Sequence, residues 1–391
     1  MRVLVVTRIF PNRVEPTFGP YNEKQLAALA KIGWDVTVIS PIPWFPGAGL
    51  VGGKTRASKA GGVPREDVIS GLTVKHPRFL HVPRLLGVHA PLYATGVAAD
   101  VVRLRGKFDV ILSPFAYPDG VASILLGRAL GIPVVVKLHG GDMNVGARLP
   151  GPGRWIRSQF PKAARIVAVS APLADLAVEV GVPRSRVDVV QDGVDESVFF
   201  IRDRTASKRA LGFDPSRKLA VYVGRLERRK GVFELMEAWD EVAKLRPDVD
   251  LVLVGDGDDT AACQRWAETT NGRARLTGNL GMREVADHIA AGDMLVLPSH
   301  AEGTPNVVIE ALASGRPVVA TRVGGIPDMI HDDRMGELVP KEDARALAAA
   351  MLRSFARTYD PAEIVKLSGR GTWTDSARAL ALSLEKAIES P

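Results

Sequence analysis

The chain has 391 residues, of which 46% are hydrophobic and 24% charged, and its single cysteine is Cys263. This length exceeds what one hydrophobic core usually serves, so we expect two domains, and the composition excludes a disordered or low-complexity protein. One cysteine excludes an internal disulfide, and its neighbours match neither a metal-binding nor a nucleophile motif.

The formal net charge of +7 is concentrated in the first half of the chain. Residues 1–200 hold 24 Lys and Arg against 15 Asp and Glu, whereas residues 201–391 hold 27 against 29. Basic and apolar residues interleave in 78–86, 103–107 and 154–157, which suits an anionic membrane surface or a lipid phosphate. The alternative is an ordinary solvated basic face. We expect no nucleic acid partner, because no aromatic-rich basic module or zinc-finger spacing is present.

Membrane-spanning and secretion signals are missing from the sequence. No run approaches the 18 or more apolar residues that would span a bilayer, and residues 1–7 are too short for the apolar core of a signal peptide. We therefore expect a cytoplasmic protein, with the inner face of the membrane as a place where it could bind peripherally.

In the first half, short apolar runs alternate with segments of helical periodicity. The expected strands are 3–7, 36–40, 110–113 and 134–138, and the expected helices are 22–32 and 120–130. This alternation predicts βαβ units and a mostly parallel sheet. Residues 41–74 interrupt it with many Gly and Pro and include Trp44 and Phe45. Such a loop is either functional, as a lid that touches the acceptor, or disordered.

The same alternation restarts in the second half. The expected strands are 219–223, 251–255, 275–277, 294–298 and 317–321, and the expected helices are 232–245, 261–269, 282–290 and 307–314. Charged residues crowd between 195 and 212, where we expect a linker. A last helix, 373–390, is expected to pack back over the first domain. The prediction is an α/β protein of two doubly wound domains, 1–195 and 196–370, followed by a C-terminal helix within 371–391.

The segment 299–310 predicts a strand end, a tight turn and a helix start. Thr304 is a candidate N-cap and Pro305 suits the first helical position, so the N–H groups of Asn306 and Val307 are expected to face an anion. Glu302 and Glu310 place a carboxylate on either side of that turn. A phosphate alone would be repelled, so this arrangement favours a diphosphate with hydroxyl-rich groups at both ends. The alternative is a capped helix with two solvated glutamates.

Several motifs together resemble the retaining glycosyltransferases of family 4, which adopt the GT-B fold of two Rossmann-like domains facing across a cleft. Residues 223–226 followed by Lys230-Gly231 match the donor-phosphate motif of that family, and Glu302 to Glu310 matches its E-x7-E signature. Further matches are 137–142, 192–195 and 323–327. The resemblance extends over most of the chain and is stronger in the second half.

The resemblance implies roles for particular residues. Glu310 would bind the ribose hydroxyls of the nucleotide, and His139 would face the transferred sugar across the cleft, with Asp142 as a weaker candidate beside it. The donor sugar and its phosphates would be held by Gly19, Arg225, Lys230, Glu302, Gly303, Thr304, Pro305 and Asn306, Pro305 having no N–H to give. Asp192, where the family often has Asn, and Asp328, where Glu is frequent, depart from the pattern.

The reaction chemistry favours the same assignment. Negative charge develops on the departing phosphate. The planar guanidinium of Arg225 and the compact ammonium group of Lys230 can both reach it. We expect these cations to replace a metal ion, and we expect no cofactor. The run 255–258 is no dinucleotide fingerprint, which argues against NAD.

The expected function is metal-independent transfer of a hexose-type sugar from a nucleotide diphosphate, with retention, in which the leaving phosphate helps deprotonate the acceptor. The first half resembles bacterial enzymes that build capsules, teichuronic acids and exopolysaccharides on saccharide or lipid-linked saccharide acceptors. A nucleotide-sugar epimerase on the same fold and a non-catalytic nucleotide-sugar binding protein are the alternatives. The choice among UDP, GDP and ADP, the sugar and the acceptor stay open.

Overall fold

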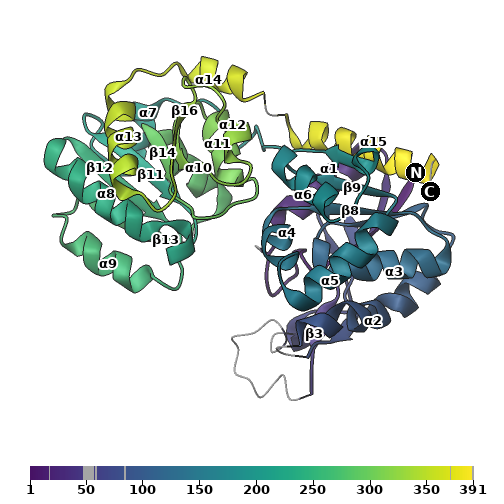
Figure 1. Cartoon of the computed structure of the whole chain (residues 1–391). Helices are drawn as coiled ribbons and strands as arrows, with labels where there is room; N and C mark the ends of the chain where they lie inside the picture. Colours follow the sequence, from purple (N-terminus) through teal and green to yellow (C-terminus); the bar gives the residue numbers. More distant parts are fainter. Residues whose placement is uncertain (17, 47–56, 58–59, 83–84, 370, 390–391) are drawn as a thin grey trace. The chain divides into compact units, whose positions relative to one another are not determined.

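The computed structural model describes residues 1–16, 18–46, 57, 60–82, 85–369 and 371–389. The chain divides into two compact units, Met1–Gly193 with Trp373–Pro391, and Val194–Thr372 (Figure 1). Each unit is built on its own sheet, mostly parallel in the first unit and parallel in the second, with helices around it, so the α/β prediction is confirmed.

The sheet of the first unit has eight described strands, in the order β10-β9-β8-β7-β1-β2-β5-β4. Their bounds are β1 Arg2–Val6, β2 Asp35–Ile39, β4 Glu66–Ile69, β5 Leu72–Lys75, β7 Val110–Ser113, β8 Val134–Leu138, β9 Arg165–Ala168 and β10 Val187–Val189. Neighbouring strands run parallel, except that β4 and β5 are antiparallel. The strand order reverses between β1 and β7, and such sheets bind ligands beyond the carboxyl ends of the strands at that point.

Helices cover both faces of this sheet. They are α1 Pro20–Lys31, α2 His89–Arg103, α3 Val121–Leu130, α4 Gly141–Gly146, α5 Pro150–Gln159, α6 Ala171–Glu179 and α15 Trp373–Glu389. Short helical turns are η2 Ala60–Gly62, η3 Leu86–Val88, η4 Ala116–Gly120, η5 Phe160–Lys162 and η6 Arg184–Arg186. Alternate residues of β1 enter opposite cores: Val3 and Val5 join the cluster of α1 and α15, whereas Leu4 and Val6 join the cluster of α2 and α3.

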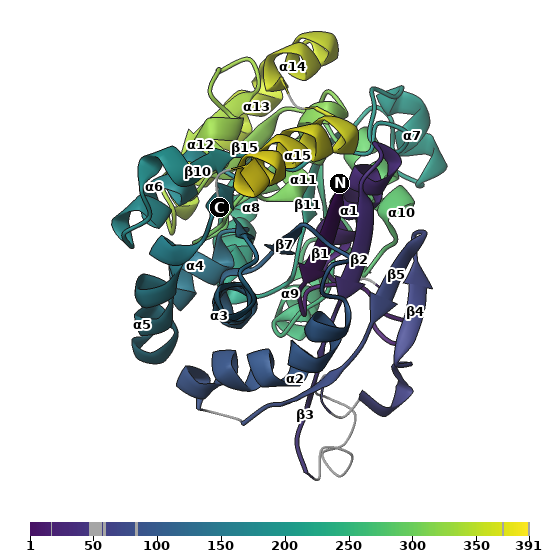
Figure 2. The same cartoon turned by 90° about the vertical axis from the view of Figure 1, so that its right-hand side faces the viewer.

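Helix α15 returns to the first unit from the far end of the sequence. It packs beside α1, as Figures 1 and 2 show, with Ala377, Leu380 and Leu384 buried in the shared core. Gln25 of α1 donates from Nε2 to Ser376 Oγ of α15 at 2.8 Å. The last helix therefore belongs to the same hydrophobic core as the first strand.

The stretch expected to be one long loop, 41–74, is largely structured where it is described. Strand β3 (Ile42–Trp44) pairs in parallel with β6 (Arg78–Leu80), and β4 and β5 form a hairpin on the edge of the main sheet. Residues 47–56 and 58–59 lie outside the described residues. The prediction of an uninterrupted loop was wrong, because short polar-apolar alternation in β4 and β5 was hidden among glycines and charged residues.

The second unit has a six-stranded parallel sheet among its described residues, in the order β13-β12-β11-β14-β15-β16. The strands are β11 Lys218–Val223, β12 Val249–Val254, β13 Ala274–Gly278, β14 Met294–Leu297, β15 Val318–Thr321 and β16 Gly336–Val339. The helices are α7 Arg204–Ala210, η7 Arg228–Lys230, α8 Val232–Leu245, α9 Thr260–Glu268, α10 Met282–Ala291, α11 Asn306–Ala313, α12 Ile326–Met329, α13 Ala344–Ala356 and α14 Pro361–Ser368. One hydrophobic cluster runs through this unit.

The charged segment between 195 and 212 is not the linker that the sequence suggested. It contains α7 and is fixed to the second unit by ion pairs of Arg202 with Asp287, and of Arg204 and Lys208 with Asp293. Its charged side chains form ion pairs within the unit instead of facing solvent. A high density of charged residues therefore did not indicate a linker here.

Candidate functional site

In the second unit, the donor-phosphate motif and the E-x7-E segment meet at one ion pair. Lys230 Nζ lies 2.6 Å from Glu302 Oε1, and the two side chains are 19% and 10% exposed. Ser299 Oγ donates to the same carboxylate oxygen at 2.6 Å. Lys230 ends the turn η7 after β11, and Glu302 lies in the loop after β14, so both residues come from the carboxyl edge of the sheet. Open α/β sheets bind ligands at this edge.

Gly231 allows this approach. It has a φ of 72°, and a Cβ atom there would lie 2.0 Å from the carbonyl oxygen of Pro298. Only glycine satisfies both the left-handed backbone and the contact. The motif Lys-Gly is therefore needed to bring η7 against the end of β14.

The loop that holds Glu302 is braced by the motif at 323–327. A Cβ atom on Gly324, whose φ is 55°, would lie 2.0 Å from Glu302 O, and Gly325 N donates to Gly303 O at 2.7 Å. Thr321 Oγ1 donates to Ser299 O at 2.5 Å. Backbone contacts at Gly324 and Gly325, with the hydroxyl of Thr321, therefore hold the loop in place without a ligand.

Helix α11 begins at Asn306, one residue before the helix 307–314 expected from periodicity and one residue after the start at Pro305 expected from the capping pattern. Pro305 is its N-cap, with an extended backbone at φ −70° and ψ 118°, so Thr304 is not the cap and Pro305 is not the first helical residue. Thr304 Oγ1 and Asn306 Oδ1 are both buried without a hydrogen-bond partner. Buried polar atoms are nearly always paired. Two unpaired atoms beside a helix start, where backbone N–H groups lack intrahelical partners, fit a polar ligand at this point. Glu310 lies on the same helix.

Arg225 lies in the loop after β11, and its side chain is 60% exposed. The buried Tyr222 anchors this loop by donating from its hydroxyl to Arg225 O at 2.8 Å. Burial raises the pKa of Tyr222, and the Glu302 carboxylate raises it further. Arg225 Nε lies 3.4 Å from Glu227 Oε1, and its Nη2 lies 4.0 Å from Asp258. The guanidinium is thus near the motif loop and accessible to a ligand.

Asp256 and Asp258 have an Asp-x-Asp spacing in the loop between β12 and α9. Asp256 Oδ1 accepts from Gly257 N at 2.8 Å and from Thr260 Oγ1 at 2.5 Å, which holds the turn before α9. In the part of the chain that the structure describes, no three His, Cys, Asp or Glu side chains gather as metal ligands.

In the first unit, His139 directly follows β8. Its ring packs against Tyr21 with centroids 4.6 Å apart, its Nδ1 lies 3.9 Å from Asp192 Oδ2, and its buried Nε2 has no partner. Burial and, to a smaller extent, the Lys137 ammonium lower the pKa of His139 to about 3, although Asp192 opposes the shift. At neutral pH the imidazole is therefore neutral, and it can offer Nε2 to a ligand as a donor or an acceptor.

Asp142, a weaker candidate from the sequence, holds the His139 loop. Its Oδ1 accepts from the backbone N–H groups of His139, Gly140 and Met143 at 3.1, 2.8 and 3.1 Å. Its Oδ2 accepts from Ala116 N at 2.9 Å. Because these four donors surround a carboxylate that is almost fully buried, we assign Asp142 to positioning rather than to chemistry.

A buried ion pair beneath His139 was missed in the sequence. Lys137 is fully buried, and its Nζ donates to Asp192 Oδ1 and to Gln25 Oε1, both at 2.7 Å. Gln25 reaches Ser376, whose hydroxyl donates to Gln191 O. The departure of Asp192 from the family's usual Asn now has a physical reason, because a carboxylate there neutralises Lys137. A lysine inside an otherwise apolar strand was the available signal.

Gly19 lies at the start of α1 as its N-cap, with a φ of 74°. A Cβ atom there would lie 2.8 Å from both Ile9 Cγ2 and Ile9 O, so the glycine is required by packing alone. Its expected contact with phosphate stays a prediction.

Family models match both halves of the chain. Residues 21–198 match Glycosyltransferase Family 4, and residues 217–357 match Glycosyl transferases group 1. A putative teichuronic acid biosynthesis glycosyltransferase of Bacillus subtilis, TuaC, is 34% identical over 358 residues, which are 90% of this chain and 89% of that protein. The chain belongs to the family-4 glycosyltransferases. The resemblance drawn from its motifs is thereby confirmed.

Other proteins similar to this chain carry different names. A D-inositol 3-phosphate glycosyltransferase of Segniliparus rotundus is 31% identical over 76% of this chain and 70% of that protein. An N-acetyl-alpha-D-glucosaminyl L-malate synthase of Bacillus anthracis is 29% identical over 66% and 68%. Membership in this glycosyltransferase family therefore does not fix the acceptor.

Solved structures share the fold of this glycosyltransferase. Anabaena HepE in complex with UDP has a TM-score of 0.74 at 19% identity, covering 98% of this chain and 100% of that chain. The sucrose-phosphate synthase of Thermosynechococcus elongatus has a TM-score of 0.72 at 19% identity, covering 100% and 97%. These matches confirm the predicted GT-B fold. None of the described helices is both long and apolar enough to cross a membrane.

Proposed function

We propose that this glycosyltransferase moves a sugar from a nucleoside-diphosphate sugar to a saccharide or lipid-linked saccharide acceptor, with retention of configuration and without a metal ion. The single observation that carries the proposal is the 2.6 Å pairing of Lys230 with Glu302 beside the start of α11. It joins a cation suited to a diphosphate with a carboxylate suited to sugar hydroxyls in one place.

The donor would bind across the carboxyl edge of the second unit. Arg225 and Lys230 would take the diphosphate, and the orphaned Thr304 Oγ1 and Asn306 Oδ1 would gain partners from the donor. Glu310, on the same helix as Asn306, would accept from the ribose hydroxyls. Glu302 would accept from a sugar hydroxyl while Ser299 and Lys230 hold its Oε1.

The proposed reaction breaks the bond between the anomeric carbon and the phosphate oxygen, and forms a bond from the acceptor oxygen to the same face of that carbon. The acceptor proton passes to the leaving phosphate oxygen, and a nucleoside diphosphate departs. Arg225 and Lys230 stabilise the charge that develops on this oxygen, and preorganised donors of this kind are worth about 10²–10³-fold in rate. His139, neutral at physiological pH, would donate to or accept from a sugar hydroxyl through Nε2.

Support for a lipid-linked acceptor comes from exposed apolar side chains in the first unit. Trp44, Leu80, Leu85, Leu86 and Val88 are each at least 40% exposed. Trp155 Nε1 donates to Gly87 O at 2.8 Å, which brings α5 and its exposed Arg154 beside η3. Exposed apolar residues next to cations suit an anionic lipid surface. The teichuronic acid assignment of the Bacillus subtilis relative supports a role in cell-surface polysaccharide synthesis.

The test is a transfer assay in EDTA with a panel of nucleotide sugars and lipid-linked saccharides, followed by NMR of the anomeric proton. The proposal expects a new glycoside with the donor's anomeric configuration. An inverted product would contradict retention, and activity only with added divalent cations would contradict metal independence. Conversion of the donor to an epimer, or binding without turnover, would instead favour the two alternative functions.

Membrane binding is tested separately by flotation with phosphatidylglycerol vesicles, with phosphatidylcholine vesicles as the comparison. We expect binding to the anionic vesicles only, and loss of binding in Leu86→Asp. A protein that floats with neither kind of vesicle would contradict the peripheral position.

A further inference from the structure

A cavity of about 120 Å³ lies in the second unit at the edge of the sheet opposite to the donor motifs. Lys218 begins β11, Asp293 precedes β14, and Arg316 comes just before β15, so these residues stand at the amino ends of three strands. Arg225 and Glu302 follow the carboxyl ends of β11 and β14. Because β11 has six residues of about 3.3 Å each, roughly 20 Å separate the two edges. The donor site does not account for this cavity.

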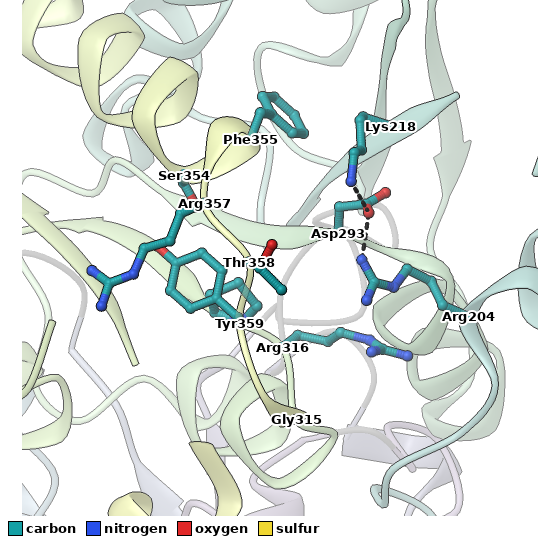
Figure 3. A pocket seen from close by; sticks show the side chains of 11 residues that line it. Arg204, Lys218, Asp293, Gly315, Arg316, Ser354, Phe355, Arg357, Thr358 and Tyr359 are labelled. Carbon is teal, nitrogen blue, oxygen red and sulfur yellow. Dashed lines mark hydrogen bonds and ion pairs between the residues drawn. The ribbon is translucent and has the colours of Figure 1, made fainter. Parts of the chain in front are cut away.

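Positive charge dominates the walls of the cavity (Figure 3). Asp293 is paired with Arg204 at 2.5 Å, with Lys208 at 2.6 Å and with Lys218 at 3.4 Å. Arg316 is a fourth cation. Arg204, Lys218 and Arg316 line the cavity together with Arg357 and one carboxylate, Asp293, whereas Lys208 pairs with Asp293 from outside the lining and Asp203 lies close enough to act on Arg316. The lining itself therefore carries more positive than negative charge.

Arg316 is the least satisfied of these cations. It is 2% exposed, and its Nη2 donates to two backbone carbonyls, Arg202 O at 3.0 Å and Ala290 O at 2.6 Å. Its buried Nε has no partner. Burial, with a smaller contribution from Arg204, lowers the pKa of Arg316 to about 10, although Asp293 and Asp203 oppose the shift. A buried guanidinium held mainly by carbonyls is costly without an anion.

Ser354 lies at the end of α13 and also lines the cavity. It is 5% exposed, and its buried Oγ has no partner. Two nine-tenths buried side chains with unpaired polar atoms thus border the same charged cavity. Buried polar groups are rarely left unpaired, so each calls for a missing partner.

We infer that this cavity binds a phosphate group, taken either from inorganic phosphate or from a phosphomonoester. A tetrahedral oxyanion would add the negative charge that is needed to neutralise the cations besides Asp293. Its oxygens would accept hydrogen bonds from Arg316, Arg204 and Ser354. The cavity volume of about 120 Å³ is several times the roughly 30 Å³ that one water molecule occupies, which leaves room for a tetrahedral oxyanion. Thr358 and the half-buried Tyr359 form the other wall in Figure 3, where the organic part of a phosphomonoester would lie.

The test is thermal-shift titration of the full chain with sodium phosphate against sodium chloride of equal ionic strength, repeated with glucose 6-phosphate. Arg204→Gln and Lys218→Gln change partly exposed side chains, so these variants are expected to fold. Each should weaken phosphate binding by about tenfold, because Arg204→Gln removes a charge-assisted hydrogen bond to the phosphate and Lys218→Gln removes a positive charge from the wall of the cavity. Arg353→Gln, an exposed residue of the same helix as Ser354 that pairs with Glu337, is the control and should bind like the wild type.

Phosphate could also bind weakly at the donor cations, so Arg225→Ala is included and should retain the response. Tighter binding of glucose 6-phosphate than of inorganic phosphate would identify a phosphomonoester as ligand, and the reverse would identify free phosphate. The inference is overturned if neither compound gives a shift beyond that of chloride, or if the shift survives in Lys218→Gln and Arg204→Gln but disappears in Arg225→Ala. This inference is independent of the proposed sugar transfer, so either can fail alone.

Discussion

Lys230 and Glu302 are 72 residues apart in sequence, yet their side chains form an ion pair of 2.6 Å at the carboxyl edge of one sheet. The pair is stabilised by close backbone packing at Gly231 and Gly324. A cation and a carboxylate are thus held together before any donor binds. Our predictions follow from this preorganised arrangement and from the buried pair beneath His139.

Arg225→Ala should reduce kcat/KM for sugar transfer by about 10²–10³-fold, because it removes one preorganised donor to the leaving phosphate. The Arg225 side chain is mostly exposed, so the free energy of unfolding is expected to be unchanged. Steady-state kinetics with a saturating acceptor measures the effect. Arg228→Ala is the matched control, since the Arg228 guanidinium lies 4.4 Å over the Phe233 ring. Equal losses in both variants would contradict the role of Arg225.

Gly231→Ala should destabilise the protein more than Gly272→Ala. Both glycines have a φ near 75°, which costs a non-glycine residue about 1–3 kcal/mol, but a Cβ atom at 231 also meets Pro298 O whereas nothing lies within 4 Å at 272. Urea unfolding measures the free energy of unfolding of each variant. Equal destabilisation would mean that the contact between residue 231 and Pro298 O does not affect the free energy of unfolding.

Lys137→Met should lower the free energy of unfolding by about 3–5 kcal/mol, because Asp192 is left as an uncompensated buried charge. The double variant Lys137→Met, Asp192→Asn should recover part of this loss. Lys31→Met, at the exposed end of α1, is the control. If Lys137→Met unfolds at the same urea concentration as Lys31→Met, the buried pair does not support the fold.

Stability should depend on pH through His139. Its folded pKa of about 3 lies below the value near 6.5 expected in the unfolded chain, so the unfolded state binds the extra proton between these limits. The free energy of unfolding should therefore fall as pH falls from about 6.5 toward 3, by at most about 1.4 kcal/mol per pH unit, and show no such slope above 6.5.

The measurement is urea unfolding at pH 4 to 8 for wild type and His139→Gln, which should lose this part of the slope. His331→Gln changes an exposed histidine and controls for the loss of a histidine in itself. Identical profiles for wild type and His139→Gln would contradict a buried neutral imidazole.

Strongly periodic elements were predictable from the sequence. Helix α8, Val232–Leu245, and strand β8, Val134–Leu138, have the predicted bounds, because a long apolar stripe and a continuous buried run are clear local signals. The hairpin of β4 and β5 was missed because its strands are short and end at Ser70-Gly71 among other glycines. Local pattern fails where strands gain stability from pairing rather than from their own apolar residues.

The site was predictable only in part. The motif spacing indicated Lys230 and Glu302, and the structure brings them together. It did not indicate that Pro305 keeps an extended backbone and moves the helix start to Asn306. The pairing of Lys137 with Asp192 joins residues 55 apart, so no local spacing could reveal it. The roles of His139, Gly19 and Glu310 in binding stay predictions.

The most direct test of the central claim is thermal stabilisation by nucleoside diphosphates and nucleotide sugars in the presence of EDTA, for wild type, Arg225→Ala and Glu310→Ala. Ligand at about 100 times its Kd should add about 2.7 kcal/mol to wild type. Glu268→Ala, an exposed glutamate at the end of α9, is the control. We predict a shift selective for one base that persists in Glu268→Ala and is lost in both site variants. The absence of any shift in wild type, or an undiminished shift in Arg225→Ala and Glu310→Ala, would contradict the proposed donor site.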